Sequence, residues 1–226
     1  MSFRGFGPQA LPFFTALAFH QTKDWFEANK QIYEDEVRAP LGDLVEDVVH
    51  RLAIAKIPIK GDRKSSLFRI HRDLRFSNNK DPYKTSAGIT LSRSGLKSDS
   101  GILYFHFSPQ ECFFAAGFHM PDPHELARLR ASAVREAKAF KHMTTELRNN
   151  GLVLSEDDSL KRAPRGLEEL ADPEIAAAAR LRSFVCVRPV VEGRTMTPEL
   201  ADDFCTFAKD ALPLLAWGWN SLADRK

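Results

Sequence analysis

Hydrophobic positions along the chain change their period several times, which predicts helices alternating with extended segments. In the clearest helix, opened by Pro121 and ended by Asn149-Asn150-Gly151, apolar residues recur at spacings of three and four over about six turns. This apolar stripe consists of Leu126, Leu129, Ala133, Ala137, Phe140, Met143 and Leu147. One long amphipathic helix is therefore expected in the middle of the chain.

Further helical patterns lie at both ends of the chain. Residues 8–19 are apolar and compatible with a helix, and Thr22 or Asp24 can cap a second helix that runs to about Arg38. Pro40 can open a third helix at its first turn. Toward the C-terminus, helices are expected over 173–182 and over about 197–211, the latter with Pro at the first helical position. Pro213 is expected to kink or end the second of these, and residues 214–222 to complete the core.

Four segments carry strand patterns. Residues 86–93 alternate apolar with small or polar positions, 102–107 and 112–118 are nearly continuous apolar runs, and 184–191 forms a last strand. The turn at 108–111 joins the middle two as a hairpin, and 152–154 and 160–163 are short extended pieces. The pattern predicts an α+β fold with a mostly antiparallel central sheet of about five or six strands, covered by N-terminal, middle and C-terminal helices. Because no segment resembles a linker, residues 1–226 are expected to form a single globular domain.

The stretch Leu67–Thr85 concentrates basic and aromatic residues in a chain of net charge +2. Its alternation from Phe68 to Phe76 predicts a half-buried strand, followed by a turn over 77–82. Arg72 falls among the core-facing positions, so it is expected in a buried pair with a carboxylate, either Asp73 or one within 27–36.

Planar arginine guanidinium groups and lysine ammonium groups in a structured loop favour binding of an anion. The expected ligand is a small molecule that carries a phosphate or carboxylate group, and a nucleotide-like molecule is one example. The alternative is a structural or interaction protein whose Arg–Asp motif is an internal fastening network without a ligand. The candidate binding residues in this stretch are Arg69, Arg72, Asp73, Arg75, Ser77, Lys80, Tyr83 and Lys84.

A second basic segment, Leu160–Gly166, is also stiffened by proline and carries Lys161, Arg162 and Arg165. The two segments are expected to line one groove, with Trp25 or Tyr83 at its wall, where a ring can stack on a base or sugar. Two further candidates, Asn29 and Lys30, lie on the aromatic second helix. For Asn29 a bond to neighbouring backbone is favoured over a role in the site.

Composition and motifs narrow the function classes. The near-neutral charge does not favour a nucleic-acid binder, no segment approaches the ~20 apolar residues of a membrane span, and the start of the chain does not resemble a signal peptide. The three widely spaced cysteines indicate free thiols in a reducing cytoplasm.

No phosphate loop, serine elbow or convergent metal-ligand set is found, so neither a metal nor a cofactor is expected. Asp73 and Tyr83 are acid–base candidates for an enzyme, but no reaction is selected, and the sequence does not define an oligomeric state.

The run R-I-H-R-D-L-R-F-S-N-N-K-D-P-Y-K resembles the signature of a mainly bacterial family, domain of unknown function family 2461. The segments Trp25–Tyr33 and Leu160–Gly166 fit the same family. The resemblance implies a single domain of mixed α and β structure without an established activity. Asn79 stands where many relatives have Asp, and His71 where they often have an aromatic or amide residue. A mechanism that requires a carboxylate at position 79 is therefore not expected here.

Overall fold

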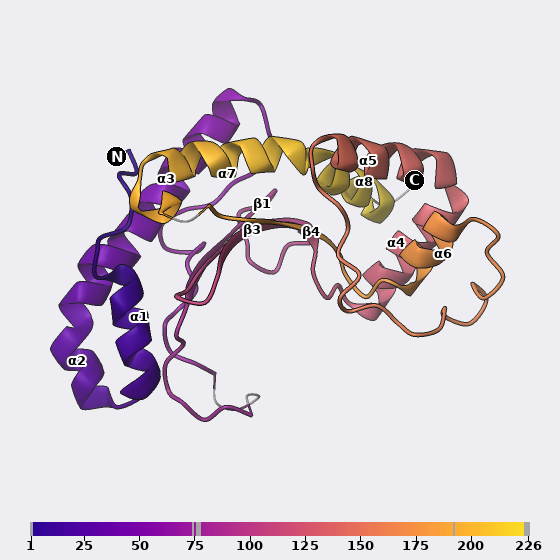
Figure 1. The fold of residues 1–226 in the computed structure, drawn as a ribbon. Helices are drawn as coiled ribbons and strands as arrows, with labels where there is room; N and C mark the ends of the chain where they lie inside the picture. The colour runs from indigo at the N-terminus through magenta and orange to yellow at the C-terminus, as the bar shows by residue number, and fades with distance from the viewer. Residues whose placement is uncertain (1, 74, 76–77, 192, 224–226) are drawn as a thin grey trace. The chain divides into compact units, whose positions relative to one another are not determined.

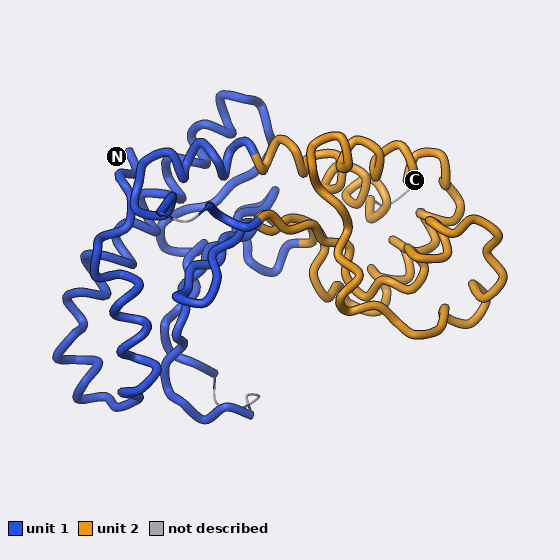
Figure 2. Tube along the Cα trace, viewed as in Figure 1, with its two compact units in different colours: residues 1–99, 104–114, 189–206 blue, residues 100–103, 115–188, 207–226 orange. Residues whose placement is uncertain are grey.

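The computed structural model describes residues 2–73, 75, 78–191 and 193–223. Its backbone contacts divide the chain into two compact units (Figure 2). The first unit comprises residues 1–99, 104–114 and 189–206, and the second comprises 100–103, 115–188 and 207–226. That both act as one domain, as the sequence suggests, stays a prediction.

The N-terminal helices belong to the first unit. They are α1 (Ala10–Phe19), α2 (Lys23–Ile32), a π-helical turn η1 (Tyr33–Arg38) and α3 (Ala39–Ile54). The side chain of Thr22 accepts a hydrogen bond from the Trp25 amide (3.3 Å), which confirms the predicted cap of the second helix. In Figure 1, α1 and α2 form a helical hairpin, whose facing sides are joined by Phe13, Trp25 and Phe26.

A single antiparallel sheet is found among the described residues. Its strands are β1 (Ala87–Ser92), β2 (Ile102–Phe107), β3 (Cys112–Phe118) and β4 (Phe184–Pro189), in the spatial order β1-β2-β3-β4. The predicted hairpin of β2 and β3 is confirmed to the residue, and both strands lie in the middle of the sheet. The predicted number of five or six strands is wrong, because the neighbouring segments add only isolated bridges: Lys60↔Ser92, Leu67↔Ile89 and Leu154↔Cys186.

The remaining helices are α4 (Pro123–Arg135), α5 (Ala137–Asn149), α6 (Pro173–Arg180), a short 3-10 turn η2 (Arg194–Met196), α7 (Glu199–Asp210) and α8 (Leu212–Leu222). The single long middle helix expected from the apolar stripe is wrong. It breaks at Glu136, whose backbone angles (φ −113°, ψ 43°) are not helical. The break lets both α4 and α5 pack against α8 in the second unit. Among the described residues, no helix has the length and apolar character needed to cross a bilayer.

Each unit has its own aromatic core. In the first unit, Phe6 stacks on Phe107 with ring centroids 4.1 Å apart, and Phe114 stacks on Phe204 at 4.7 Å. In the second, Trp217 lies within 5.4 Å of both Phe140 and Phe184. Stacked and edge-on rings at these spacings contribute beyond their buried area.

The faces of β2 differ in burial, and this difference positions the site. Leu103, Phe105 and Phe107 are fully buried, whereas Tyr104 and His106 on the opposite face are only half-buried. The alternation follows from the period of two along a strand. One face of β2 therefore builds the core, and the other presents a phenol and an imidazole.

Candidate functional site

The basic stretch Leu67–Thr85 folds as a loop that doubles back on itself. Its first arm joins the outer edge of β1 through the Phe68 amide, which donates to the Gly88 carbonyl (3.1 Å). Its two arms are tied by the bridge between His71 and Tyr83. The half-buried strand predicted for 68–76 is wrong over the described residues, because the first arm forms only isolated bridges, from Leu67 to Ile89 of β1 and from His71 to Tyr83 of the returning arm. Ser77 lies outside the described residues.

Arg72 fastens this loop. Its guanidinium donates from Nε to the Asp81 carbonyl (3.1 Å) and from Nη2 to the Tyr83 carbonyl (3.3 Å). The expected carboxylate partner is not found among the described residues, so that prediction is corrected. The turn leaves backbone carbonyls without ladder partners, and a half-buried guanidinium satisfies them with charge-assisted bonds.

Asp73 and Arg75 form a local pair at the surface. Both carboxylate oxygens of Asp73 accept from the Arg75 guanidinium, at 3.0 and 2.8 Å, and Arg69 lies at 3.5 Å. Hydrogen bonds from Arg75 hold the pKa of the Asp73 carboxyl below its usual range. Asp73 therefore stays ionised near neutral pH and is poorly suited to donate a proton, although the sequence makes it an acid–base candidate.

Lys84 lies where several cations meet. Its Nζ is 5.4 Å from the centre of the Phe68 ring, and Nζ of Lys97 is 4.9 Å from the same ring. Lys97 also donates to the Leu67 carbonyl. Burial of the half-buried side chain, followed by the charges of Arg69, Arg72 and Lys97, lowers the pKa of Lys84.

These four residues, Arg69, Arg72, Lys84 and Lys97, are called the Lys84 cluster below. Within the described part of the chain no carboxylate pairs with the ammonium of Lys84, whereas Arg69 has Asp73 and Arg72 has two carbonyls. Sequence reasoning missed Lys97, which lies in a Ser- and Gly-rich loop without a local motif. Its position over Phe68 depends on the fold alone.

Aromatic residues continue from Phe68 across the half-buried face of β2. Phe68 meets Tyr104 edge to face at 6.0 Å, and the hydroxyl of Tyr104 hydrogen-bonds Nδ1 of His106 (3.0 Å). His106 in turn stacks on Phe113 with ring centroids 4.9 Å apart. The Tyr104 hydroxyl lies over Gly88, where an added Cβ would approach it to 2.7 Å. Burial lowers the pKa of His106, so the imidazole is neutral at pH 7.

A cavity of about 300 Å³ adjoins the cluster, and Phe68 and Arg69 form part of its wall. Its cationic lining is largely paired: Lys30 with Glu27 (3.4 Å), and Arg38 with Glu34 (2.8 Å). Its full lining is Phe26, Glu27, Lys30, Tyr33, Glu34, Arg38, Arg63, Lys64, Leu67, Phe68, Arg69, Ile70 and His71. The wall of this cavity therefore contains both aromatic and charged side chains, and residues 67–71 of the basic loop form one part of it.

Most of the other candidate binding residues in the first unit contact the protein itself. Tyr83 is buried, and its ring stacks on Phe26 at 4.4 Å, so it offers no free face to a ligand. The ring of Trp25 stacks on His20 at 5.4 Å. The side chain of Asn29 donates to the Trp25 carbonyl (2.8 Å), the backbone bond that the sequence favours. Lys80 is exposed on the loop.

The second basic segment belongs to the second unit. Lys161, Arg162 and Arg165 are exposed there, in a segment without regular secondary structure. That they share a groove with the first basic segment stays a prediction. Within the described residues, no group of three or more His, Cys, Asp or Glu side chains is arranged to hold a metal ion.

These features define an α+β protein with one antiparallel sheet and a cationic cluster on a loop at its edge. The chain belongs to the conserved hypothetical protein family DUF2461, whose model matches residues 9–217. No curated protein and no solved structure matches the chain.

Proposed function

We propose that the first unit binds a small ligand carrying a phosphate or carboxylate group, and that the Lys84 cluster receives this anion. The observation that carries the proposal is the position of the Lys84 ammonium. It is half-buried beside three other cations, over the same ring as Lys97, with no carboxylate partner in the described chain. A charge in such surroundings is stabilised by an opposite charge from outside.

The aromatic surface beside the cluster favours a ligand with a planar part. Phe68 lies beneath two ammonium groups and also touches Tyr104, and Tyr104 is hydrogen-bonded to His106. Bases stack on such rings, with each stacked base worth about 1–3 kcal/mol. A nucleotide-like molecule, with its phosphate at Lys84 and its base toward Tyr104 and His106, combines both features.

In this proposal some residues of the Lys84 cluster and the basic loop have a structural role, and others bind the ligand. Arg72 and Asp73 hold the loop in shape through their bonds to Asp81, Tyr83 and Arg75, while Lys84, Lys97 and Arg69 present charge to the ligand. The bonds of Arg72 equally favour the second candidate, a structural or interaction protein whose motif only fastens the loop. What distinguishes the two candidates is Lys84, whose ammonium contacts the Phe68 ring but has no carboxylate partner in the described structure.

The test compares three probes that share parts: adenosine monophosphate, ribose 5-phosphate and adenosine, titrated calorimetrically at low salt. We expect the monophosphate to bind most tightly, ribose 5-phosphate about tenfold more weakly because it cannot stack, and adenosine weakest. Lys84→Met should abolish binding of both phosphates. Lys138→Met, which removes an exposed lysine charge on α5, is the matched control and should change nothing. Binding that is absent from the unaltered protein, or equal in both variants, refutes the proposal.

We also propose a cytoplasmic location. The three cysteines are all free thiols, and Cys186 and Cys205 are buried. Burial raises the pKa of Cys186 to about 12, so this thiol is protonated and inert at neutral pH. Free thiols of this kind are typical of a reducing compartment. Cell fractionation tests the location, and recovery of the protein outside the cytoplasm would contradict it.

A further inference from the structure

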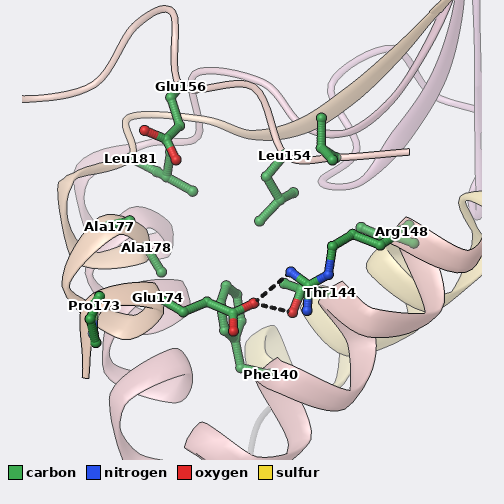
Figure 3. Close-up of a pocket in the computed structure, with 12 residues that line it drawn as sticks. Phe140, Thr144, Arg148, Leu154, Glu156, Pro173, Glu174, Ala177, Ala178 and Leu181 are labelled. Atoms are coloured by element: carbon green, nitrogen blue, oxygen red, sulfur yellow. Dashed lines mark hydrogen bonds and ion pairs between the residues drawn. The ribbon is translucent and has the colours of Figure 1, made fainter. Parts of the chain in front are cut away.

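The second unit contains a cavity of its own, with a volume of about 400 Å³ (Figure 3). It lies between α5, α6 and the extended segment 153–156. Its volume falls within the range of about 300–1,000 Å³ typical of small-ligand pockets. The lining residues are mostly apolar: Phe140, Thr144, Leu147, Arg148, Val153, Leu154, Glu156, Pro173, Glu174, Ala177, Ala178 and Leu181.

The cation in this cavity is already paired. Arg148 donates from Nη1 to Oε1 of Glu174 (3.0 Å), and the hydroxyl of Thr144 donates to the same oxygen (Figure 3). Arg148 also donates to the hydroxyl of Thr145. The positive charge of Arg148 is therefore matched inside the protein and is not available to an anionic ligand.

A second carboxylate lies on the other wall. Figure 3 shows Glu156 and Glu174 on opposite sides of the cavity. Glu156 is exposed at the rim, and no ion pair to its carboxylate is found among the residues that the structure describes. The lining thus carries two carboxylates against one guanidinium, an excess of negative charge on otherwise apolar walls.

We propose that this cavity binds a small apolar molecule bearing a protonated amine. Its apolar body would contact Leu147, Leu154 and Ala178, and its ammonium would meet the carboxylate of Glu156. Charge complementarity selects the amine, because an anion would meet the uncompensated carboxylate and a neutral molecule would leave it unused. The site is independent of the Lys84 cluster, since all its residues belong to the second unit.

The test uses three probes with the same ring and different head groups: cyclohexylamine, cyclohexanol and cyclohexanecarboxylate. Binding is followed by NMR shifts of the methyl groups of Leu147 and Leu154 in the full chain. We expect the amine to bind roughly threefold more tightly than the alcohol, the value of one surface ion pair, and the carboxylate to bind more weakly than either.

Two pairs of variants locate the site. Val153→Trp covers the rim and should abolish the shifts, whereas Val191→Trp alters another well-exposed valine, in the first unit, and should leave them unchanged. Glu156→Gln should make amine and alcohol bind equally, whereas Glu169→Gln, outside the lining, should preserve the preference. Because all four side chains are at least partly exposed, the variants should fold. No shift with any probe overturns the site, and equal binding of amine and alcohol to the unaltered protein overturns the choice of an amine.

Discussion

Replacing Lys84 should separate binding from stability. Lys84→Met keeps most of the side-chain stem and removes the ammonium. The change loses one cation–π contact with Phe68, worth about 0.5–1 kcal/mol. It also relieves repulsion from Arg69, Arg72 and Lys97, at roughly 0.2–1 kcal/mol for each partly exposed pair. These contributions nearly cancel or favour the variant, so the free energy of unfolding should stay within about 1 kcal/mol of the unaltered protein or rise.

Arg72→Met is the matched comparison, since it removes another cation of the same cluster. It leaves the carbonyls of Asp81 and Tyr83 without their charge-assisted bonds, at a cost of about 2–3 kcal/mol in total. For a chain of this length each 1 kcal/mol shifts the melting temperature by about 2–4 °C. Arg72→Met also relieves the repulsion between Arg72 and Lys84, at roughly 0.2–1 kcal/mol, so it should melt at least about 2 °C lower. Lys84→Met should melt at the same temperature or higher.

The assay is thermal unfolding followed by circular dichroism in a buffer free of phosphate. The same scan is repeated with adenosine monophosphate, which should stabilise the unaltered protein by about 2.7 kcal/mol at a hundred times its Kd, and Lys84→Met not at all. If Lys84→Met lost as much stability as Arg72→Met, Lys84 would be a fastening residue, and the reasoning that separates it from Arg72 would be refuted.

Three further outcomes are expected. Burial lowers the pKa of His106 in the folded state, so its contribution to stability should be present above the unfolded pKa of about 6.5 and lost as the pH falls below it. In urea unfolding, the free energy of unfolding of His106→Asn should therefore decrease less over this pH range than that of the unaltered protein. Because the proposed anion binding requires a charged Lys84, whose pKa is lowered by burial, the affinity for the monophosphate should fall with rising pH before an ordinary lysine, of pKa about 10.4, would titrate; calorimetry checks this. Gly117→Ala should cost several kcal/mol in urea unfolding, since φ is +128° and an added Cβ would lie 2.0 Å from the Phe184 carbonyl oxygen, whereas Gly151→Ala, with open space around it, should cost much less.

Local periodicity sufficed for most of the fold. The hairpin of β2 and β3 follows from two apolar runs around a Pro-containing turn, and its bounds match the prediction. The break at Glu136 could not be read from the chain, because Glu136 is a good helix former and the stripe continues on both sides. Two separate helices allow both α4 and α5 to pack on α8, a tertiary contact that the local pattern does not contain.

Most residues of the candidate site were predictable from the sequence, but their geometry was not. The sequence pointed to Arg69, Arg72 and Lys84, which the fold does bring together. The alternation of apolar and polar residues in the basic stretch gave a wrong partner for Arg72, which binds carbonyls nine and eleven residues away instead of a carboxylate. Lys97 had no local signal. Tyr104 and His106 are two residues apart on a predicted strand, which places their side chains on the same face. This spacing was not used to predict the pair as part of the candidate site.

The most direct measurement is a crystal of the protein soaked in tungstate, a phosphate mimic located by its anomalous scattering. If the Lys84 cluster binds anions, a peak should lie within hydrogen-bonding distance of the Lys84 and Lys97 ammonium groups, and it should disappear in crystals of Lys84→Met. Lys138→Met crystals serve as the control and should keep the peak. A soaked crystal with no anomalous peak at these cations, or with the same peak in Lys84→Met, would contradict anion binding at the cluster.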